Sequence, residues 1–171
     1  MKKIVITGGL GYIGTELCKI YSGYSWNDKI TVIDNRFVSE RVNQIRNWNM
    51  NFVQGDILDK DLIKKYCEDA DIVHHLAGVT DVPRVKSESS PDQEDLIKKV
   101  AEEGTQNILD VISDECKIIM PSTHVVYEGL ESIKKDIKEN EKTCPVLAYG
   151  KSKDINENQL KKSGKNYIIL R

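Results

Sequence analysis

Residues 7–14, with the sequence Thr-Gly-Gly-Leu-Gly-Tyr-Ile-Gly, constrain the fold of this chain more than any other stretch. They follow an apolar run at residues 4–6 and precede apolar residues at helical spacing, so they form a strand-to-helix turn. In such a turn Gly8 permits the sharp bend, Gly11 lets the backbone approach a pyrophosphate, and Gly14 lets helix and strand pack closely. The free N–H groups at the start of the helix attract phosphate. The motif therefore predicts a dinucleotide-binding turn.

An acidic residue stands where such a turn needs one. Asp34 ends the next apolar run, residues 30–33, at the expected distance from the glycine motif. A carboxylate there accepts hydrogen bonds from the adenosine ribose and repels a 2′-phosphate, so we expect NAD as the cofactor. Arg36 lies two residues on, and an arginine can accept that phosphate, which keeps NADP as an alternative.

Short apolar runs alternate with helical patterns along the whole chain. The runs are residues 4–6, 30–33, 51–53, 72–76, 118–120 and 167–170, and most are continuous and β-branched, as in strands buried on both faces. Helices are expected after Gly11, after an N-cap at Asp59, from Pro91 to Ile112, and from Pro145 towards Gly164. This alternation predicts an α/β domain over residues 1–171, with a doubly wound parallel sheet in a three-layer αβα arrangement.

Composition excludes several other classes of protein. Lys plus Arg is 25 and Asp plus Glu is 27, which gives a formal net charge of −2 and no electrostatic case for nucleic acid or a membrane surface. No run approaches the about 20 apolar residues of a membrane span. The four cysteines form no close pair, so we expect free thiols and a cytoplasmic protein. His74 and His75 are adjacent on a predicted strand, so they point to opposite faces, and no metal site is expected.

Two further segments carry groups for proton chemistry. Tyr149 and Lys153 are four residues apart on a predicted helix and share a face, so the lysine charge can lower the pKa of a tyrosine base. A solvated tyrosine–lysine pair is the alternative. Residues 122–127 follow the strand at 118–120, and a hydroxyl such as that of Thr123 can bind a substrate oxygen beside Tyr149. Ser-Thr pairs are also common where strands end.

Six motifs in order resemble the extended short-chain dehydrogenase/reductase family of nucleotide-sugar epimerases and dehydratases. Residues 7–14 resemble its TGxxGxxG turn, residues 123–127 its S/T-x-x-V-Y segment, and residues 149–153 its YxxxK helix. Three more stretches are similar to its GD[IL], HLAA and GTxNLL segments, at residues 55–57, 75–78 and 104–109. The resemblance runs from Ile4 to Arg171.

The resemblance implies a Rossmann domain that binds NAD and a nucleotide sugar, and a homodimer formed through the two long helices. It implies that Tyr149 is the general acid/base, that Lys153 tunes it and binds the nicotinamide ribose, and that Thr123 orients the substrate hydroxyl. The residues implied to bind the cofactor are Gly8, Gly11, Tyr12, Ile13, Gly14, Asp34, Asn35, Asp56, Ile57, Leu76, Ala77, Gly78, Tyr149 and Lys153.

Departures from the family pattern narrow the function. Its dehydratases carry Asp-Glu after the threonine, and here His124 and Val125 stand there, which disfavours dehydration. A 4-epimerase is expected, with a 4-reductase or a reductase of a non-sugar substrate open. Ala101 replaces an asparagine of the long helix. Members of the family continue past the position of Arg171 into a substrate domain absent here. An NAD-binding module without turnover is therefore the alternative function, and a redox-sensing binding partner is a third possibility.

Overall fold

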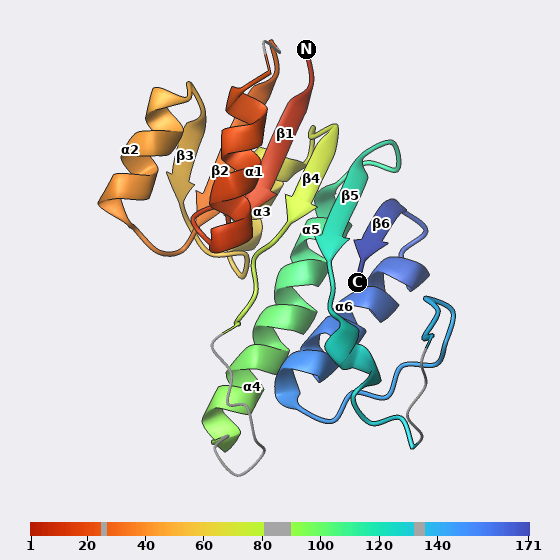
Figure 1. Cartoon of the computed structure of the whole chain (residues 1–171). Helices are drawn as coiled ribbons and strands as arrows, with labels where there is room; N and C mark the ends of the chain where they lie inside the picture. The colour runs from red at the N-terminus through yellow and green to blue at the C-terminus, as the bar shows by residue number, and fades with distance from the viewer. Residues whose placement is uncertain (25–26, 81–89, 132–135) are drawn as a thin grey trace.

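A parallel sheet forms the centre of the molecule (Figure 1). The computed structural model describes residues 1–24, 27–80, 90–131 and 136–171. Within them the six strands have the order β3-β2-β1-β4-β5-β6, and every neighbouring pair is parallel. The strands are β1 (Lys3–Thr7), β2 (Lys29–Asp34), β3 (Asn51–Gln54), β4 (Ile72–His75), β5 (Lys117–Pro121) and β6 (Asn166–Leu170). Each coincides with a predicted apolar run, and the order is that of a Rossmann fold, as predicted.

Helices connect the strands. They are α1 (Tyr12–Ser22), α2 (Ser39–Asn47), α3 (Lys60–Cys67), α4 (Pro91–Lys99), α5 (Thr105–Val111) and α6 (Ala148–Lys162). A π-helical segment, η2 (Val100–Gly104), joins α4 to α5, and a 3₁₀ turn, η3 (His124–Tyr127), follows β5. Helix α2 was not predicted, because it is short and polar and buries only Val42 and Ile45. None of the helices in these described ranges has the length and hydropathy of a membrane span.

Local signals set the helix ends where the sequence indicates them. The Asp59 side chain accepts a hydrogen bond from the Leu62 N–H, so Asp59 is the N-cap of α3, as predicted. The Ser90 side chain caps α4 through the Gln93 N–H, with Pro91 in the first turn. After α6 the chain turns at Gly164, whose φ is 70°. These local contacts set where α3 and α4 begin, and Gly164 marks the turn after α6.

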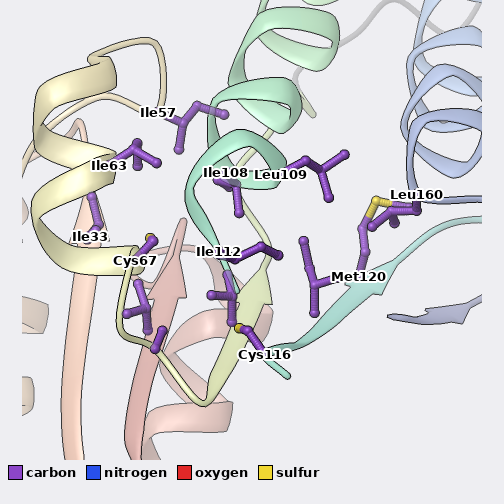
Figure 2. Close-up of a cluster of buried hydrophobic side chains, with 14 residues drawn as sticks. Ile33, Ile57, Ile63, Cys67, Ile108, Leu109, Ile112, Cys116, Met120 and Leu160 are labelled. Carbon is purple, nitrogen blue, oxygen red and sulfur yellow. The ribbon is translucent and has the colours of Figure 1, made fainter. Parts of the chain in front are cut away.

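Two apolar clusters cover the two faces of the sheet. Ile4, Ile6 and Val32 pack towards α1 and α2 with Val42 and Ile45. Val5, Val73 and Ile118 face the other side, where α3, α5 and α6 contribute Ile63, Ile108 and Leu160 (Figure 2). Since successive strand residues point to opposite faces, a strand covered on both sides must be apolar at every position. This burial accounts for the continuous runs of the inner strands β2, β1, β4 and β5, whereas Tyr167, Ile168 and Leu170 of the edge strand β6 are exposed. The carboxyl ends of all strands lie along one edge (Figure 1).

Candidate dinucleotide-binding site

A cavity of about 430 Å³ lies at that carboxyl edge. All fourteen residues predicted to bind the cofactor line it, although they come from the carboxyl ends of four strands, β1 to β4, and from α1 and α6. Thr123 does not line it, whereas the neighbouring Ser122 does. The cavity has two ends. The glycine end is formed by Gly8, Gly11, Gly14, Asp34 and Asn35, and the lysine end by Pro121, Ser122, Tyr149 and Lys153.

The glycine turn leaves no room for side chains. Gly8 has a φ of 70°, and a Cβ on it would lie 2.6 Å from the Ala77 nitrogen. A Cβ on Gly14 would lie 2.6 Å from the Gly9 Cα. Gly11 is the N-cap of α1, and no side chain caps this helix. The N–H groups of its first turn therefore remain for an anionic ligand such as a pyrophosphate.

Asp34 is tied to the glycine turn through its carboxylate. It is 4% exposed, its Oδ2 accepts the Leu10 N–H at 2.9 Å, and its Oδ1 accepts the Arg36 N–H at 3.0 Å. The Arg36 Nε lies 3.6 Å from Oδ1. Asn35 donates to the Asp56 Oδ2 at 2.9 Å, which links the ends of β2 and β3. The carboxylate oxygens keep lone pairs for ribose hydroxyls at the place that the sequence predicts.

Tyr149 and Lys153 share one face of α6, as their spacing indicates. The Lys153 Nζ donates to the Pro121 carbonyl at 3.1 Å and lies 5.9 Å from the centre of the Tyr149 ring. Burial lowers the pKa of Lys153 to about 8 and raises the pKa of Tyr149. Burial thus favours the protonated phenol of Tyr149 and makes the amine of Lys153 easier to deprotonate than that of an exposed lysine.

The two hydroxyls after β5 have different environments. The Thr123 Oγ1 accepts the Val125 N–H at 3.2 Å and caps η3. The Ser122 Oγ donates to the Glu157 Oε1 at 2.5 Å, inside the lining of the cavity. The sequence predicts a functional hydroxyl in this segment. Of the two adjacent residues, Ser122 lines the cavity and Thr123 does not.

Glu157, which the sequence analysis missed, is a fully buried carboxylate behind the lysine end. Its Oε1 also accepts a hydrogen bond from the Arg171 Nε at 2.8 Å. Its Oε2 accepts a hydrogen bond from the Lys161 Nζ at 2.9 Å and forms an ion pair with Arg171. Burial alone would raise the pKa of Glu157, but the hydrogen bonds from Arg171, Ser122 and Lys161 outweigh it and lower the pKa to about 2. The available signal is spacing, since residues 149, 153, 157 and 161 recur every four positions of α6.

A second set of buried hydrogen bonds links α6 to η2, α5, β4 and β1. The Asn156 Nδ2 donates to the Ala101 carbonyl at 2.8 Å and to the Thr105 Oγ1 at 2.7 Å. Thr105 bonds the His75 Nε2 at 2.9 Å, and the His75 Nδ1 bonds the Thr7 Oγ1 at 2.9 Å. Ala101 stands where the resembled family has an asparagine, and its carbonyl accepts a hydrogen bond from an asparagine of the neighbouring helix α6. Val100, the first residue of this π-helical segment, lines the cavity.

The paired histidines face opposite sides of β4, as predicted. The His74 Nε2 bonds the Tyr21 hydroxyl on α1 at 2.8 Å, while His75 bonds Thr105 on α5. Burial lowers the pKa of His74 to about 4 and that of His75 to about 3, and the Lys153 charge adds to the second shift. Among the residues that the structure describes, no three metal-ligating side chains cluster.

Comparison with known proteins places the chain among relatives of the same fold. Residues 5–169 match the profile of the 3-beta hydroxysteroid dehydrogenase/isomerase family. CDP-paratose 2-epimerase of Salmonella typhi is 32% identical over 154 residues, which are 83% of this chain and 43% of that protein.

Solved structures of epimerases superpose on the whole chain. UDP-N-acetylglucosamine 4-epimerase from Methanobrevibacter ruminantium M1 has a TM-score of 0.79 at 28% identity, covering 99% of this chain and 54% of that one. UDP-glucose 4-epimerase from Brucella ovis, in complex with NAD, has a TM-score of 0.78 at 27% identity, covering 100% and 51%. The chain spans about half the length of these relatives.

Proposed function

The chain belongs to the extended short-chain dehydrogenase/reductase family of NAD-dependent epimerases and dehydratases, and from this premise we propose that it forms the NAD-binding part of a nucleotide-sugar 4-epimerase or 4-reductase. The observation that carries the proposal is one cavity that joins the glycine turn and Asp34 to Tyr149 and Lys153. A phosphate site, a ribose site and a proton-transfer pair then lie along one ligand.

The residues of the cavity fit NAD. Backbone atoms of Gly9 and Ala77 occupy the space that side chains at Gly14 and Gly8 would need, so the turn presents backbone to a pyrophosphate. Asp34 offers carboxylate lone pairs beside Asn35, where an adenosine ribose would lie. Its negative charge disfavours the 2′-phosphate of NADP. Bound NAD would accept a hydride from the substrate carbon at C4 of its nicotinamide and return it.

Tyr149 is proposed to move the proton that accompanies the hydride. Its Oη takes the proton of the substrate hydroxyl and later gives it back, with Thr123 orienting that hydroxyl. Lowering a tyrosine pKa from about 10 to about 7 requires about 4 kcal/mol. The Lys153 Nζ lies 5.9 Å from the centre of the Tyr149 ring. A positive charge about 6 Å from the hydroxyl would supply about 3 kcal/mol at an effective dielectric of about 20. Since burial raises the pKa of Tyr149, the reaction needs a second positive charge at the lysine end.

We further propose that residues 1–171 bind NAD but do not turn over a nucleotide sugar without the part that full-length relatives have in addition. All fourteen cofactor residues lie within this chain. Orientation of the substrate is worth about 7–11 kcal/mol of barrier, and the matched relatives are about twice as long. NAD binding without turnover is thus the second candidate for this stretch.

Calorimetric titration with NAD and NADP tests the cofactor assignment. We expect NAD to bind and NADP to bind at least about tenfold more weakly, because of Asp34. Asp34→Ala should weaken NAD binding about tenfold, whereas Asp61→Ala, an equal charge change at an exposed position of α3, should not. Tighter binding of NADP would contradict the assignment.

Incubation of the chain with NAD and UDP-, GDP- or dTDP-sugars tests the second part. We expect neither epimerised product nor NADH absorbance. Turnover of about 1 per second or faster, as enzymes commonly reach, would contradict the need for a further part and would support an epimerase or reductase complete within these residues.

A homodimer through α4, α5 and α6 is proposed by resemblance to the family. Helices α4 and α5 follow one another through η2, and α6 lies beside them. Leu96 on α4 is 51% exposed. Sedimentation equilibrium at increasing protein concentration should show a dimer, and a monomer at every concentration would contradict it.

A further inference from the structure

The Ser122 hydroxyl has a defined polarity. Its partner is the Glu157 Oε1 at 2.5 Å, and that carboxylate is ionised because Arg171 and Lys161 also bind it. A carboxylate only accepts hydrogen bonds, so the hydrogen of Ser122 points to Glu157. Two lone pairs remain on the Ser122 oxygen, and the contact with a buried anion makes them stronger acceptors.

Ser122 itself lies at the lysine end of the cavity. Ser122 lines the cavity and directly follows Pro121, whose carbonyl holds Lys153. Asp34 and the glycine turn take the adenosine and the pyrophosphate, so a dinucleotide that fills the cavity has its nicotinamide at the lysine end. The Lys153 ammonium only donates hydrogen bonds there, whereas Ser122, whose own hydrogen is used by Glu157, offers a side-chain acceptor for a donor on the ligand.

The hydrogen-bond donor on nicotinamide is its carboxamide NH₂ group. We propose that the Ser122 Oγ accepts a hydrogen bond from this NH₂ and that Glu157 imposes the acceptor role on Ser122. The inference rests on the proposed binding of NAD. It gives the two hydroxyls after β5 separate tasks: Ser122 binds the cofactor from the wall of the cavity, and Thr123, which does not line the cavity, remains for the substrate side.

An NAD analogue isolates this contact. In 3-acetylpyridine adenine dinucleotide a methyl group replaces the NH₂, so the donor is lost while the carbonyl is kept. Both dinucleotides are titrated calorimetrically into the 171-residue chain and into Ser122→Ala. We expect Ser122→Ala to weaken NAD binding about tenfold and to change binding of the analogue less than about twofold.

Two more variants make the test robust. Ser163→Ala is the matched control, because the Ser163 Oγ donates to the Leu160 carbonyl at the far end of α6, outside the cavity. It should bind both dinucleotides as the unaltered chain does. Ser122→Cys keeps a side chain of similar shape with a weak acceptor, and it should reproduce the selective loss for NAD if Ser122→Ala does not fold.

The outcomes separate the inference from its premise. Equal losses for NAD and the analogue in both Ser122 variants, or no loss for NAD, would overturn the Ser122 assignment and leave the proposed function standing. Absence of NAD binding by the unaltered chain would overturn the proposed function, and the Ser122 assignment with it.

Discussion

The glycine end and the lysine end of the cavity are held in place by different kinds of contact. At the glycine end, Asp34 accepts two backbone N–H groups, and Gly8 and Gly14 pack against backbone atoms. At and behind the lysine end, buried and half-buried side chains hold one another across long stretches of sequence. Ser122 binds Glu157, which binds Arg171, and Asn156 binds Thr105.

This difference separates two ways of shaping a ligand site. The glycine end depends on residues without side chains, because a Cβ added at Gly8 or Gly14 would collide with backbone atoms. The lysine end depends on polar side chains whose partners must all be present, because an unpaired buried charge or hydrogen-bonding group is costly. Substitutions should therefore damage the first end through crowding and the second through lost partners.

Breaking the charge cluster of the lysine end should have the largest effect. Glu157→Gln keeps the shape but leaves Arg171 and Lys161 without their buried anion. We expect the free energy of unfolding in urea to fall by about 3–5 kcal/mol. Glu102→Gln removes a carboxylate from an exposed pair with Lys98 at 3.8 Å and should cost less than about 1 kcal/mol. Equal losses for the two variants would contradict the role given to burial.

Crowding the glycine end should come next. Gly8→Ala places a Cβ 2.6 Å from the Ala77 nitrogen at a φ of 70°. We expect a loss of about 3 kcal/mol in unfolding free energy and no calorimetric signal with NAD. Gly164→Ala has the same φ of 70° with nothing within 4 Å of the new Cβ, so it should cost only about 1 kcal/mol and leave NAD binding unchanged. If both variants behaved alike, the backbone angle rather than crowding would be decisive.

Acid should act at β4, which lies between the two ends. Burial lowers the pKa of His74 from 6.5 to about 4, so its contribution to stability is complete above pH 6.5 and is lost as pH falls through 4. Between pH 7 and 5 this loss is about 2 kcal/mol, and His75 adds a second loss in the same range. Urea titrations of His74→Gln should show a smaller acid loss than the unaltered chain. His124→Gln, at an exposed position, should retain the full loss.

The smallest effect should come from Asn156→Ala. It removes the donors to the Ala101 carbonyl and the Thr105 hydroxyl, and we expect a loss of about 1–2 kcal/mol in unfolding free energy. Asn158→Ala removes an exposed amide of the same helix, bonded to Asp154, and should change stability by less than about 0.5 kcal/mol. An unchanged stability in Asn156→Ala would show that the π-helical segment does not need this partner.

The strands and most helices could be predicted because their signals are local. A strand buried on both faces must be apolar throughout, and caps such as Asp59 act within one turn. Helix α2 was missed because its two buried side chains, Val42 and Ile45, make too short a pattern against its polar residues. The residues of the glycine end could also be predicted from the sequence, since a strand, three spaced glycines and an acidic residue lie within one βαβ unit.

The partners at the lysine end could not be read in advance. The sequence around Glu157 does not indicate that Ser122 and Arg171 are its hydrogen-bond partners. The sequence around Asn156 likewise does not indicate its bond to the Ala101 carbonyl. The order of amino acids determined the αβ alternation, the glycine turn and the shared face of Tyr149 and Lys153, because period, spacing and backbone freedom are properties of short segments. Only the tertiary structure decides that Ser122 rather than Thr123 lines the cavity, and that Glu157 pairs with Arg171 and Lys161. Such contacts exist only after parallel strands and helices have brought distant residues to one edge of the sheet.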